Sequence, residues 1–326
     1  MKAIVCTKYG PPEALQLKEV EKPTPKDNEA LVKIQASSLN AADFETMRGA
    51  SVVRITAPLK PMHKILGSDI AGQVEAIGRN VKQFRPGDEI WADLSFPYGF
   101  GAFAEYVCVP ENALRLKPAS MTFEEAASVP TSAVVALQNL LAKRLIQPGQ
   151  RVLINGAGGG VGTFAVQIAK HFGAEVTGVD SAGKLDMLRS IGADHVIDYT
   201  REDFTRNGQL YDLILDVVVH RSISDYMRAL SPEGICIMVG GSMTRIFFNL
   251  LLGLFISMTS KKRIGLGMWE PNKKGDLALL AELFEAGKVK PVIDRRYPLR
   301  EVPEALRYLE EGHAKGKVVI TMEGNS

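Results

Sequence analysis

Cysteine, surplus charge and long apolar runs are all scarce in this 326-residue chain. Its three cysteines, Cys6, Cys108 and Cys236, lie far apart, which excludes a disulfide scaffold and a C-x-x-C redox pair. We expect them to be small core residues on strands. The formal net charge of +2 provides no basic surplus for binding nucleic acid. With 46% hydrophobic and 23% charged residues, the composition is that of an ordinary globular protein long enough for two domains.

One apolar stretch, residues 246–258, raises the question of a membrane. As a helix it would span roughly 20 Å, which is short of the ~30 Å hydrocarbon core of a bilayer. Two interpretations stay open. Either the segment is buried against a substrate pocket or a partner subunit, or it makes an in-plane membrane contact between Arg245 and the basic residues Lys261, Lys262 and Arg263. The first ten residues carry no secretory signal, so we expect a cytoplasmic protein.

The glycine-rich stretch between residues 155 and 163 is the strongest indication of function. Residues 152–154 indicate a buried strand, and apolar residues at helical spacing follow the glycines until Gly173. Such a turn lets a pyrophosphate bind the free N–H groups at a helix N-terminus. The alternative is a turn that is glycine-rich for steric reasons alone. The predicted cofactor-binding residues are Ala157, Gly158, Gly159, Gly160, Val161 and Gly162, with Ala157 in place of the first glycine of G-x-G-x-x-G.

Short apolar runs divided by glycine, proline and aspartate predict a β-rich module in the first 120 residues. A helical pattern over residues 124–141 follows, and strands and helices then alternate, which predicts a doubly wound parallel sheet. We assign residues 1–124 and 272–326 to one domain and residues 125–271 to the other. The expected strands of the parallel sheet are 152–154, 175–179, 195–197, 211–215, 235–239 and 264–268.

Several short motifs occur in a characteristic order. They are Asn40-Ala41-Ala42-Asp43, Gly67-Ser68-Asp69-Ile70-Ala71-Gly72, Pro86-Gly87-Asp88, Gly101-Ala102-Phe103-Ala104-Glu105-Tyr106, Gly192-Ala193-Asp194 and Gly316-Lys317-Val318-Val319-Ile320. With the glycine turn, they resemble the medium-chain dehydrogenase/reductase superfamily, most closely its zinc-free, zeta-crystallin-like quinone oxidoreductase branch. The resemblance implies an α/β protein with a GroES-like β-rich catalytic domain and a Rossmann cofactor domain. It also implies an NAD(P)H cofactor and a homodimer paired through residues 264–268.

Zinc-binding relatives in this superfamily carry Cys where this chain has Asn40 and His where it has Ser68. An amide and a hydroxyl do not replace a thiolate and an imidazole, so we expect no metal. Without a Lewis acid to stabilise an alkoxide, alcohol oxidation is disfavoured. Hydride transfer from NAD(P)H to a quinone or an α,β-unsaturated carbonyl remains. The histidines have no partner at metal-ligand spacing: His63, His171, His195, His220 and His313.

Asn40 and Tyr106 are the candidate catalytic residues. The resemblance implies that the Asn40 amide hydrogen-bonds a substrate carbonyl, although an Asn in a β module is often only a turn residue. Residues 47–53 lack the tyrosine that donates a proton in some relatives. The proton would then come from water or from a group such as Tyr98 or Tyr106, and the alternative for Tyr106 is a structural strand residue.

Further cofactor contacts are expected at the carboxyl ends of the parallel strands. Val217, Gly240 and Gly241 would line the nicotinamide side. Thr131 would meet the nicotinamide ribose, unless it only caps a helix. Lys317 would approach the cofactor by resemblance, unless it is a solvated lysine.

The choice between NADH and NADPH stays open. Asp180 lies 18 residues beyond Gly162 at the end of the second strand, where a carboxylate accepts hydrogen bonds from the adenosine ribose of NADH. The resembling branch mostly uses NADPH, and Lys184 beside Ser181 could supply the cation for its 2′-phosphate.

The leading hypothesis is a zinc-independent, NAD(P)H-dependent reductase of quinones or enones. A neighbouring alternative is an enoyl or alkenal double-bond reductase. A third hypothesis is a non-catalytic NAD(P)H-binding protein that contacts a membrane through residues 246–258.

Overall fold

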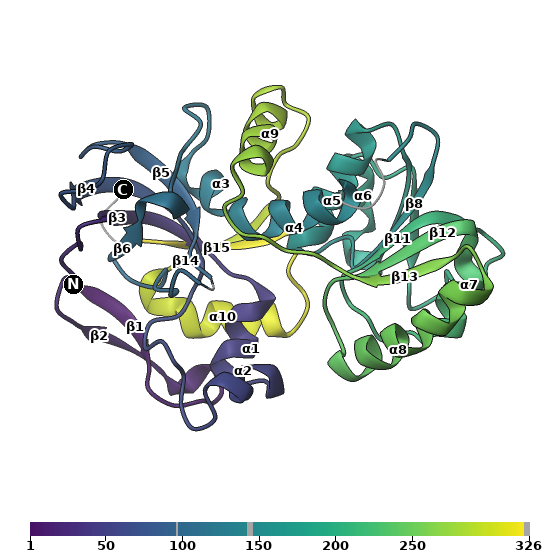
Figure 1. Cartoon of the computed structure of the whole chain (residues 1–326), viewed down its shortest axis with the longest axis horizontal. Coiled ribbons are helices and arrows are strands. Elements are labelled where there is room, and N and C mark those ends of the chain that lie inside the picture. The colour runs from purple at the N-terminus through teal and green to yellow at the C-terminus, as the bar shows by residue number, and fades with distance from the viewer. Residues whose placement is uncertain (96, 142–145, 323–326) are drawn as a thin grey trace. The chain divides into compact units, whose positions relative to one another are not determined.

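A computed structural model describes residues 1–95, 97–141 and 146–322, with the backbone alone at residues 51, 52, 56, 254, 255 and 257–259. The chain divides into two compact units (Figure 1). Unit 1 comprises Met1–Ser132, Pro271–Ala281 and Ile293–Ser326, and unit 2 comprises Ala133–Glu270 and Glu282–Val292. The unit bounds differ from the predicted domains in two places. Residues 125–132 and 271 belong to unit 1 instead of the Rossmann domain, and residues 282–292 belong to unit 2 instead of the catalytic domain.

Unit 1 is built on a seven-stranded sheet in the order β14-β15-β3-β4-β5-β7, with β6 paired to β3. Helix α1 (Ala41–Arg48) follows β3 directly, because Asn40 leaves the strand in an extended conformation and Gly49 ends the helix with a φ of +68°. The predicted β-rich module is confirmed, whereas β2 and α1 were not expected. The strands are β1 (Lys2–Cys6), β2 (Leu15–Glu19), β3 (Glu29–Ser38), β4 (Asp69–Ile77), β5 (Glu89–Asp93), β6 (Tyr106–Pro110), β7 (Arg115–Leu116), β14 (Ile293–Pro298) and β15 (Lys317–Thr321).

The core of unit 1 lies between this sheet and α10 (Val302–Glu310). Ile34, Ile70 and Ile90 contribute to it from β3, β4 and β5, and Leu306 contributes from α10. Helices α2 (Ser51–Thr56) and α3 (Phe123–Ala127) also belong to unit 1. Helices α4 (Pro130–Leu141) and α9 (Lys274–Glu285) each begin in unit 1 and end in unit 2.

Unit 2 contains a six-stranded parallel sheet in the order β10-β9-β8-β11-β12-β13. The order reverses at β8, so the carboxyl ends of β8 and β11 form the switch point where doubly wound sheets bind ligands. The predicted doubly wound sheet is confirmed. Its elements are β8 (Arg151–Asn155), α5 (Gly160–His171), β9 (Glu175–Asp180), α6 (Leu185–Ser190), β10 (His195–Asp198), β11 (Tyr211–Asp216), α7 (Ile223–Ala229), β12 (Leu230–Met238), α8 (Met243–Thr259) and β13 (Arg263–Leu266).

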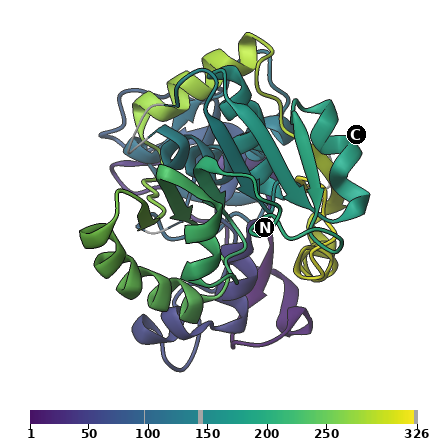
Figure 2. The same cartoon turned by 90° about the vertical axis from the view of Figure 1, so that its right-hand side faces the viewer.

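Helix α8 contains the apolar stretch predicted over residues 246–258, although the side chains of 254, 255, 257 and 258 lie outside the described ones. Figure 2 shows this helix in green at the lower left. Ile246 and Asn249 are buried, and the opposite side of the helix exposes large apolar residues. Within the described chain, no helix has both the length and the apolar character needed to cross a membrane. The exposed residues are Met243, Phe247, Phe248, Leu251 and Leu252.

Candidate active site

The turn between β8 and α5 requires glycine at position 156. Gly156 has a φ of +80°, and a Cβ there would lie 2.7 Å from Val217 Cγ2. Ala157 is fully buried, and a Cβ on Gly178 of β9 would lie only 3.2 Å from its methyl group. The left-handed residue of the turn is therefore Gly156, and a small residue suffices at Ala157.

Gly162 lets the first turn of α5 pack directly on this loop. A Cβ at position 162 would lie 2.3 Å from the Gly156 carbonyl oxygen and 2.6 Å from the Ala157 carbonyl carbon. Gly160, Val161 and Gly162 begin the helix, so their N–H groups have no acceptor within it. These groups and the positive end of the helix dipole suit a pyrophosphate.

Asp180, at the end of β9, closes the turn from the side. Its Oδ2 accepts a hydrogen bond from the Gly158 N–H at 2.8 Å, and its Oδ1 accepts one from the Ser181 N–H at 2.8 Å. Lys184 Nζ lies 3.4 Å from Asp180 Oδ1, and both side chains are largely buried. The predicted residues Gly158, Asp180, Ser181 and Lys184 thus come together, with the carboxylate already paired to a cation.

The neighbouring edge of the sheet brings Val217, Gly240 and Gly241 together. The Val219 N–H donates to the Gly240 carbonyl at 2.8 Å, and a Cβ on Gly241 would lie 2.3 Å from the Val219 nitrogen. Buried Asp216 fixes the end of β11, because it accepts hydrogen bonds from Tyr226 Oη at 2.7 Å and Asn155 Nδ2 at 3.0 Å. In unit 2, glycines and polar backbone groups therefore line the carboxyl ends of β11 and β12.

Unit 1 contains a separate buried polar cluster around Asn40. Its Nδ2 donates to Ser68 Oγ at 3.1 Å and to Asp69 Oδ2 at 2.9 Å, and its Oδ1 accepts from Lys317 Nζ at 2.7 Å. Both amide protons are therefore used within the protein, and Asn40 is only 8% exposed. In this conformation Asn40 has no proton left for a substrate carbonyl, which differs from the role implied by the resemblance.

Lys317 is enclosed rather than solvated. The side chain is 1% exposed, and Nζ donates to the Leu39 carbonyl at 3.0 Å, to Asn40 Oδ1 and to Ser132 Oγ at 3.1 Å. Asp69 Oδ2 lies 3.5 Å away. Burial lowers the pKa of Lys317, and the charge of Asp69 opposes this shift. Its three ammonium protons are used inside unit 1, which leaves none for the predicted cofactor contact.

Asp43, on α1, joins this cluster with an incompletely satisfied carboxyl group. Its Oδ2 accepts from the Asn40 N–H at 2.7 Å, whereas its Oδ1 is buried without a hydrogen-bond partner among the residues that the structure covers. Burial raises the pKa of Asp43 to about 7. The hydrogen bond from the Asn40 N–H opposes this shift, and the negative charge of Asp69 adds to it.

Tyr106 is not brought to the cluster. It pairs with Lys33 on β3, and its ring lies beneath Lys22 Nζ at 3.8 Å. Residues 33 and 40 are roughly 20 Å apart along an extended strand at ~3.3 Å per residue. The structure thus favours the structural alternative for Tyr106. Tyr98 is partly buried against the unit 1 core.

The remaining sequence predictions concern the cysteines and a metal site. Cys6, Cys108 and Cys236 are free thiols on strands, as expected, with Cys6 and Cys236 buried and Cys108 partly buried. Across residues 1–95, 97–141 and 146–322, no three His, Cys, Asp or Glu side chains are grouped so that they could hold a metal.

Comparison with known proteins decides the family. The alcohol dehydrogenase GroES-like domain matches residues 26–119, and the zinc-binding dehydrogenase family matches residues 191–320. The chain is 35% identical to 2-methylene-furan-3-one reductase of Solanum lycopersicum, over 98% of this chain and 79% of that protein. The chain belongs to the medium-chain dehydrogenase/reductase superfamily.

Other relatives place this medium-chain reductase among quinone oxidoreductases and alkenal reductases. It is 32% identical to the chloroplastic NADPH-dependent alkenal/one oxidoreductase of Arabidopsis thaliana, over 98% of this chain and 79% of that protein. The solved quinone oxidoreductase from Coxiella burnetii superposes with a TM-score of 0.88 at 29% identity, covering 98% and 99% of the two chains. The predictions of this superfamily and of an NAD(P)H-dependent oxidoreductase are therefore confirmed.

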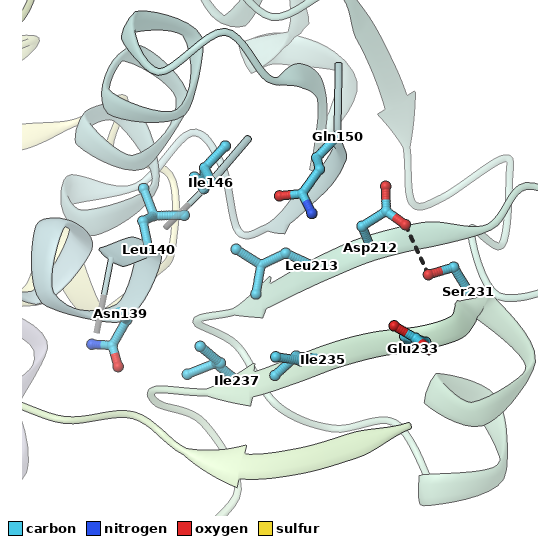
Figure 3. Close-up of a pocket in the computed structure, with 10 residues that line it drawn as sticks. All are labelled: Asn139, Leu140, Ile146, Gln150, Asp212, Leu213, Ser231, Glu233, Ile235 and Ile237. Carbon is cyan, nitrogen blue, oxygen red and sulfur yellow. Dashed lines mark hydrogen bonds between the residues drawn. The ribbon is translucent and has the colours of Figure 1, made fainter. Parts of the chain in front are cut away.

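A cavity of about 180 Å³ in unit 2 of the reductase lies apart from its glycine turn (Figure 3). Gln150, Asp212 and Ser231 lie at the amino-terminal ends of β8, β11 and β12, where Ser231 Oγ donates to Asp212 Oδ1 at 2.8 Å. The cofactor turn occupies the carboxyl ends of these strands. The cavity is also smaller than the ~300–1,000 Å³ typical of ligand sites, so it is not the cofactor site.

Proposed function

We propose that this protein reduces a quinone or an α,β-unsaturated carbonyl with NAD(P)H. The observation that carries the proposal is the turn from Gly156 to Gly162. Positions 156 and 162 leave no room for a Cβ, because the turn packs on Val217 and on its own backbone. This packing places the first N–H groups of α5, which have no acceptor within the helix, where a pyrophosphate can bind them. The relatives that reduce furanones, alkenals and quinones support the choice of acceptor.

The residues of unit 2 would bind and orient the cofactor. The N–H groups of Gly160, Val161 and Gly162 would hold the pyrophosphate, and Gly240 and Gly241 would line the nicotinamide side. Bound NAD(P)H supplies a hydride from nicotinamide C4. The contribution of the chain is then to hold the cofactor in a reactive orientation and to exclude water.

We propose that the reaction needs no zinc, because the residues at the expected metal position do not fit the ion. Asn40 and Ser68 offer an amide and a hydroxyl that are hydrogen-bonded to each other at 3.1 Å. The Lys317 ammonium lies 2.7 Å from Asn40 Oδ1 and would repel a divalent cation there.

We propose a preference for NADPH over NADH. The ion pair with Lys184 leaves the Asp180 carboxylate less repulsive toward a 2′-phosphate. Strand β10 pairs with β9 so that Asp198 lies beside Asp180 at the carboxyl ends of both strands. The exposed residues Tyr199 and Arg201 come shortly after Asp198 and therefore lie at the same end of the sheet. The sequence analysis did not identify these two residues, because their proximity to Asp180 depends on the strand register.

The experiment that tests the proposal follows oxidation of NADPH and NADH with a quinone panel, an enal and enone panel, and no acceptor. The expected result is acceptor-dependent oxidation, with hydroquinone or saturated carbonyl identified by mass spectrometry and no loss of rate after chelation. Tight NADPH binding without turnover on any acceptor would instead support the non-catalytic hypothesis.

Contact with a membrane surface is a second candidate property, favoured by the exposed apolar side of α8. Residues 233–270 contain four cations and two carboxylates, and Lys261 is paired with Glu233 at 2.8 Å. The remaining surplus of cations suits an anionic lipid surface. We propose that Phe247 and Phe248 enter the interfacial layer. Anionic vesicles should sediment the wild-type protein but not the Phe247→Ser/Phe248→Ser variant. Leu116→Ser, an exposed apolar position in unit 1, serves as the control. Absence of wild-type binding would contradict the proposal.

We also propose a homodimer that pairs through β13. This strand is the edge of the parallel sheet, and Leu266, Met268 and Trp269 are exposed beside it. Light scattering should report a dimer for the wild type and a monomer for Leu266→Lys. A monomeric wild type would contradict this assembly.

A further inference from the structure

Two aspartates of unit 1 share one threonine hydroxyl. Thr131 Oγ1 lies 2.6 Å from Asp69 Oδ1 and 2.9 Å from Asp93 Oδ2. A hydroxyl has one proton to donate, so it can satisfy only one of these short oxygen–oxygen contacts. The other contact is attractive only if the second carboxyl group itself carries a proton.

The strand register brings the two carboxyl groups together. Asp69 on β4 is paired directly opposite Asp93 on β5, and both side chains are fully buried. Like charges directly opposite one another destabilise a sheet, and two buried carboxylates in contact do not both ionise readily. This arrangement is independent of the hydrogen-bond count, and it also requires a retained proton.

The surrounding donors indicate which carboxyl group is ionised. Asp69 accepts hydrogen bonds from the Thr131 N–H at 3.0 Å, from Asn40 Nδ2 and from Ser38 Oγ at 3.2 Å, and the Lys317 ammonium lies nearby. Among the residues that the structure describes, Asp93 has no such cation as a partner. Its Oδ1 accepts only from the N–H and hydroxyl of Ser95, which leaves Oδ2 facing Thr131. The ionised group is thus Asp69, and the proton belongs to Asp93.

The groups around Asp93 act on its pKa in both directions. Asp43, Asp69 and Lys317 are the titratable groups in the cluster. Burial, and then the charge of Asp69, raises the pKa of Asp93 to about 6, although the hydrogen bonds from Ser95 and Thr131 lower it. The side chains of Asp69 and Asp93 are closed off from solvent, whereas Thr131, which bridges them, is partly exposed.

We propose that Asp93 stores a proton that the Thr131 hydroxyl passes on during the reduction. This inference rests on the proposed function. Hydride from NAD(P)H adds to the β-carbon of an enone and gives an enolate and NAD(P)⁺. Thr131 then gives the enolate the hydroxyl proton that it had donated to Asp69, and it takes the proton of Asp93. The resulting Asp93 carboxylate recovers a proton from solvent through the partly exposed Thr131 hydroxyl, so each turnover consumes one hydride and one proton.

Asn in place of Asp93 is the decisive variant. An Asn amide can donate to Thr131 Oγ1 and accept from Ser95, as a protonated Asp does, but it has no proton to transfer. Asp93→Asn should therefore keep the wild-type Tm and NADPH affinity. Asp69→Asn is the matched comparison, since an amide NH₂ at position 69 would face donors, and we expect it to lower the Tm.

The kinetic test uses kcat/KM for an enone as a function of pH. Asp93→Asn should lower kcat/KM by about a hundredfold, the typical contribution of a positioned acid, and should remove the wild-type decrease at high pH. Thr131→Val should have the same effect, and Thr131→Ser should restore activity. Unchanged kcat/KM and pH profile in Asp93→Asn would overturn the proposal.

The Tm comparison tests the stored proton on Asp93 separately from the proposed reductase function. If the wild type oxidises NADPH with no acceptor, the proposed function fails, but the Tm values still test where the proton resides. A decrease in Tm in Asp93→Asn as large as in Asp69→Asn would mean that Asp93 is ionised, and the stored proton would be refuted.

Discussion

Replacing Gly162 by alanine tests the cofactor turn most sharply. The added methyl group would lie 2.3 Å from the Gly156 carbonyl oxygen and 2.6 Å from two backbone atoms of Ala157. These obstacles are backbone atoms, so no side-chain rotation relieves them. The first turn of α5 must therefore move away from β8 by about 1 Å to restore ordinary contact distances near 3.5 Å.

The expected loss follows from that displacement. Overpacking of this kind typically destabilises a protein by about 1–3 kcal/mol, which lowers the Tm of a unit of this size by roughly 2–10 °C. The N–H groups that would bind the pyrophosphate move too, so NADPH affinity should fall at least ~10-fold, equivalent to about 1.4 kcal/mol.

Calorimetric titration with NADPH and thermal unfolding measure both effects. Gly183→Ala is the control, because a Cβ at that position meets no atom within 4 Å. Wild-type affinity and Tm in Gly162→Ala would refute the assigned packing of the turn.

Three further predictions concern charge and burial. Lys184→Gln should lower kcat/KM for NADPH about tenfold relative to NADH, because the 2′-phosphate then faces an Asp180 carboxylate that has lost its cation. Arg189→Gln is the exposed control, and an equal effect in that variant would contradict this prediction. Tyr226→Phe should lower the free energy of unfolding by about 1–3 kcal/mol in urea, since its hydroxyl donates to a buried carboxylate; a smaller loss would contradict it. Asp43 has a raised folded-state pKa of about 7, so its folded form retains a proton that the unfolded chain loses near pH 4. Stability is therefore lost as pH rises through that window, and Asp43→Asn should gain about 2 kcal/mol more over wild type at pH 8 than at pH 5; a pH-independent difference would refute the assignment.

The cofactor side of the molecule was predictable because its signals are local. A strand, a glycine turn and a helix follow one another within residues 151–171, and Asp180 ends the next strand. The sequence did not show which residue of the turn takes the left-handed conformation. The frame counted back from Gly162 placed Ala157 at the first position, whereas the backbone takes its left-handed conformation at Gly156. The space at Gly156 is limited by Val217, which lies 61 residues away in the sequence, so this requirement for glycine is not visible in the local pattern.

The polar cluster of unit 1 was not predictable to the same degree. Asn40 and Lys317 were singled out, but their contacts with Asp69 depend on the pairing of β15 with β3 and of β3 with β4. A sequence pattern does not fix such non-local registers. The available signal was an aspartate directly beside apolar residues at one end of each strand, Asp69 in β4 and Asp93 in β5.

The most direct test of the central claim is NADPH oxidation by the purified protein in the presence of a quinone and of an enone, with the reduced product identified. The account predicts acceptor-dependent oxidation, one saturated carbonyl or hydroquinone per NADPH, at a rate that chelators do not lower. NADPH that binds but is not oxidised by any acceptor in the panel, or activity that disappears on chelation and returns with zinc, would contradict it.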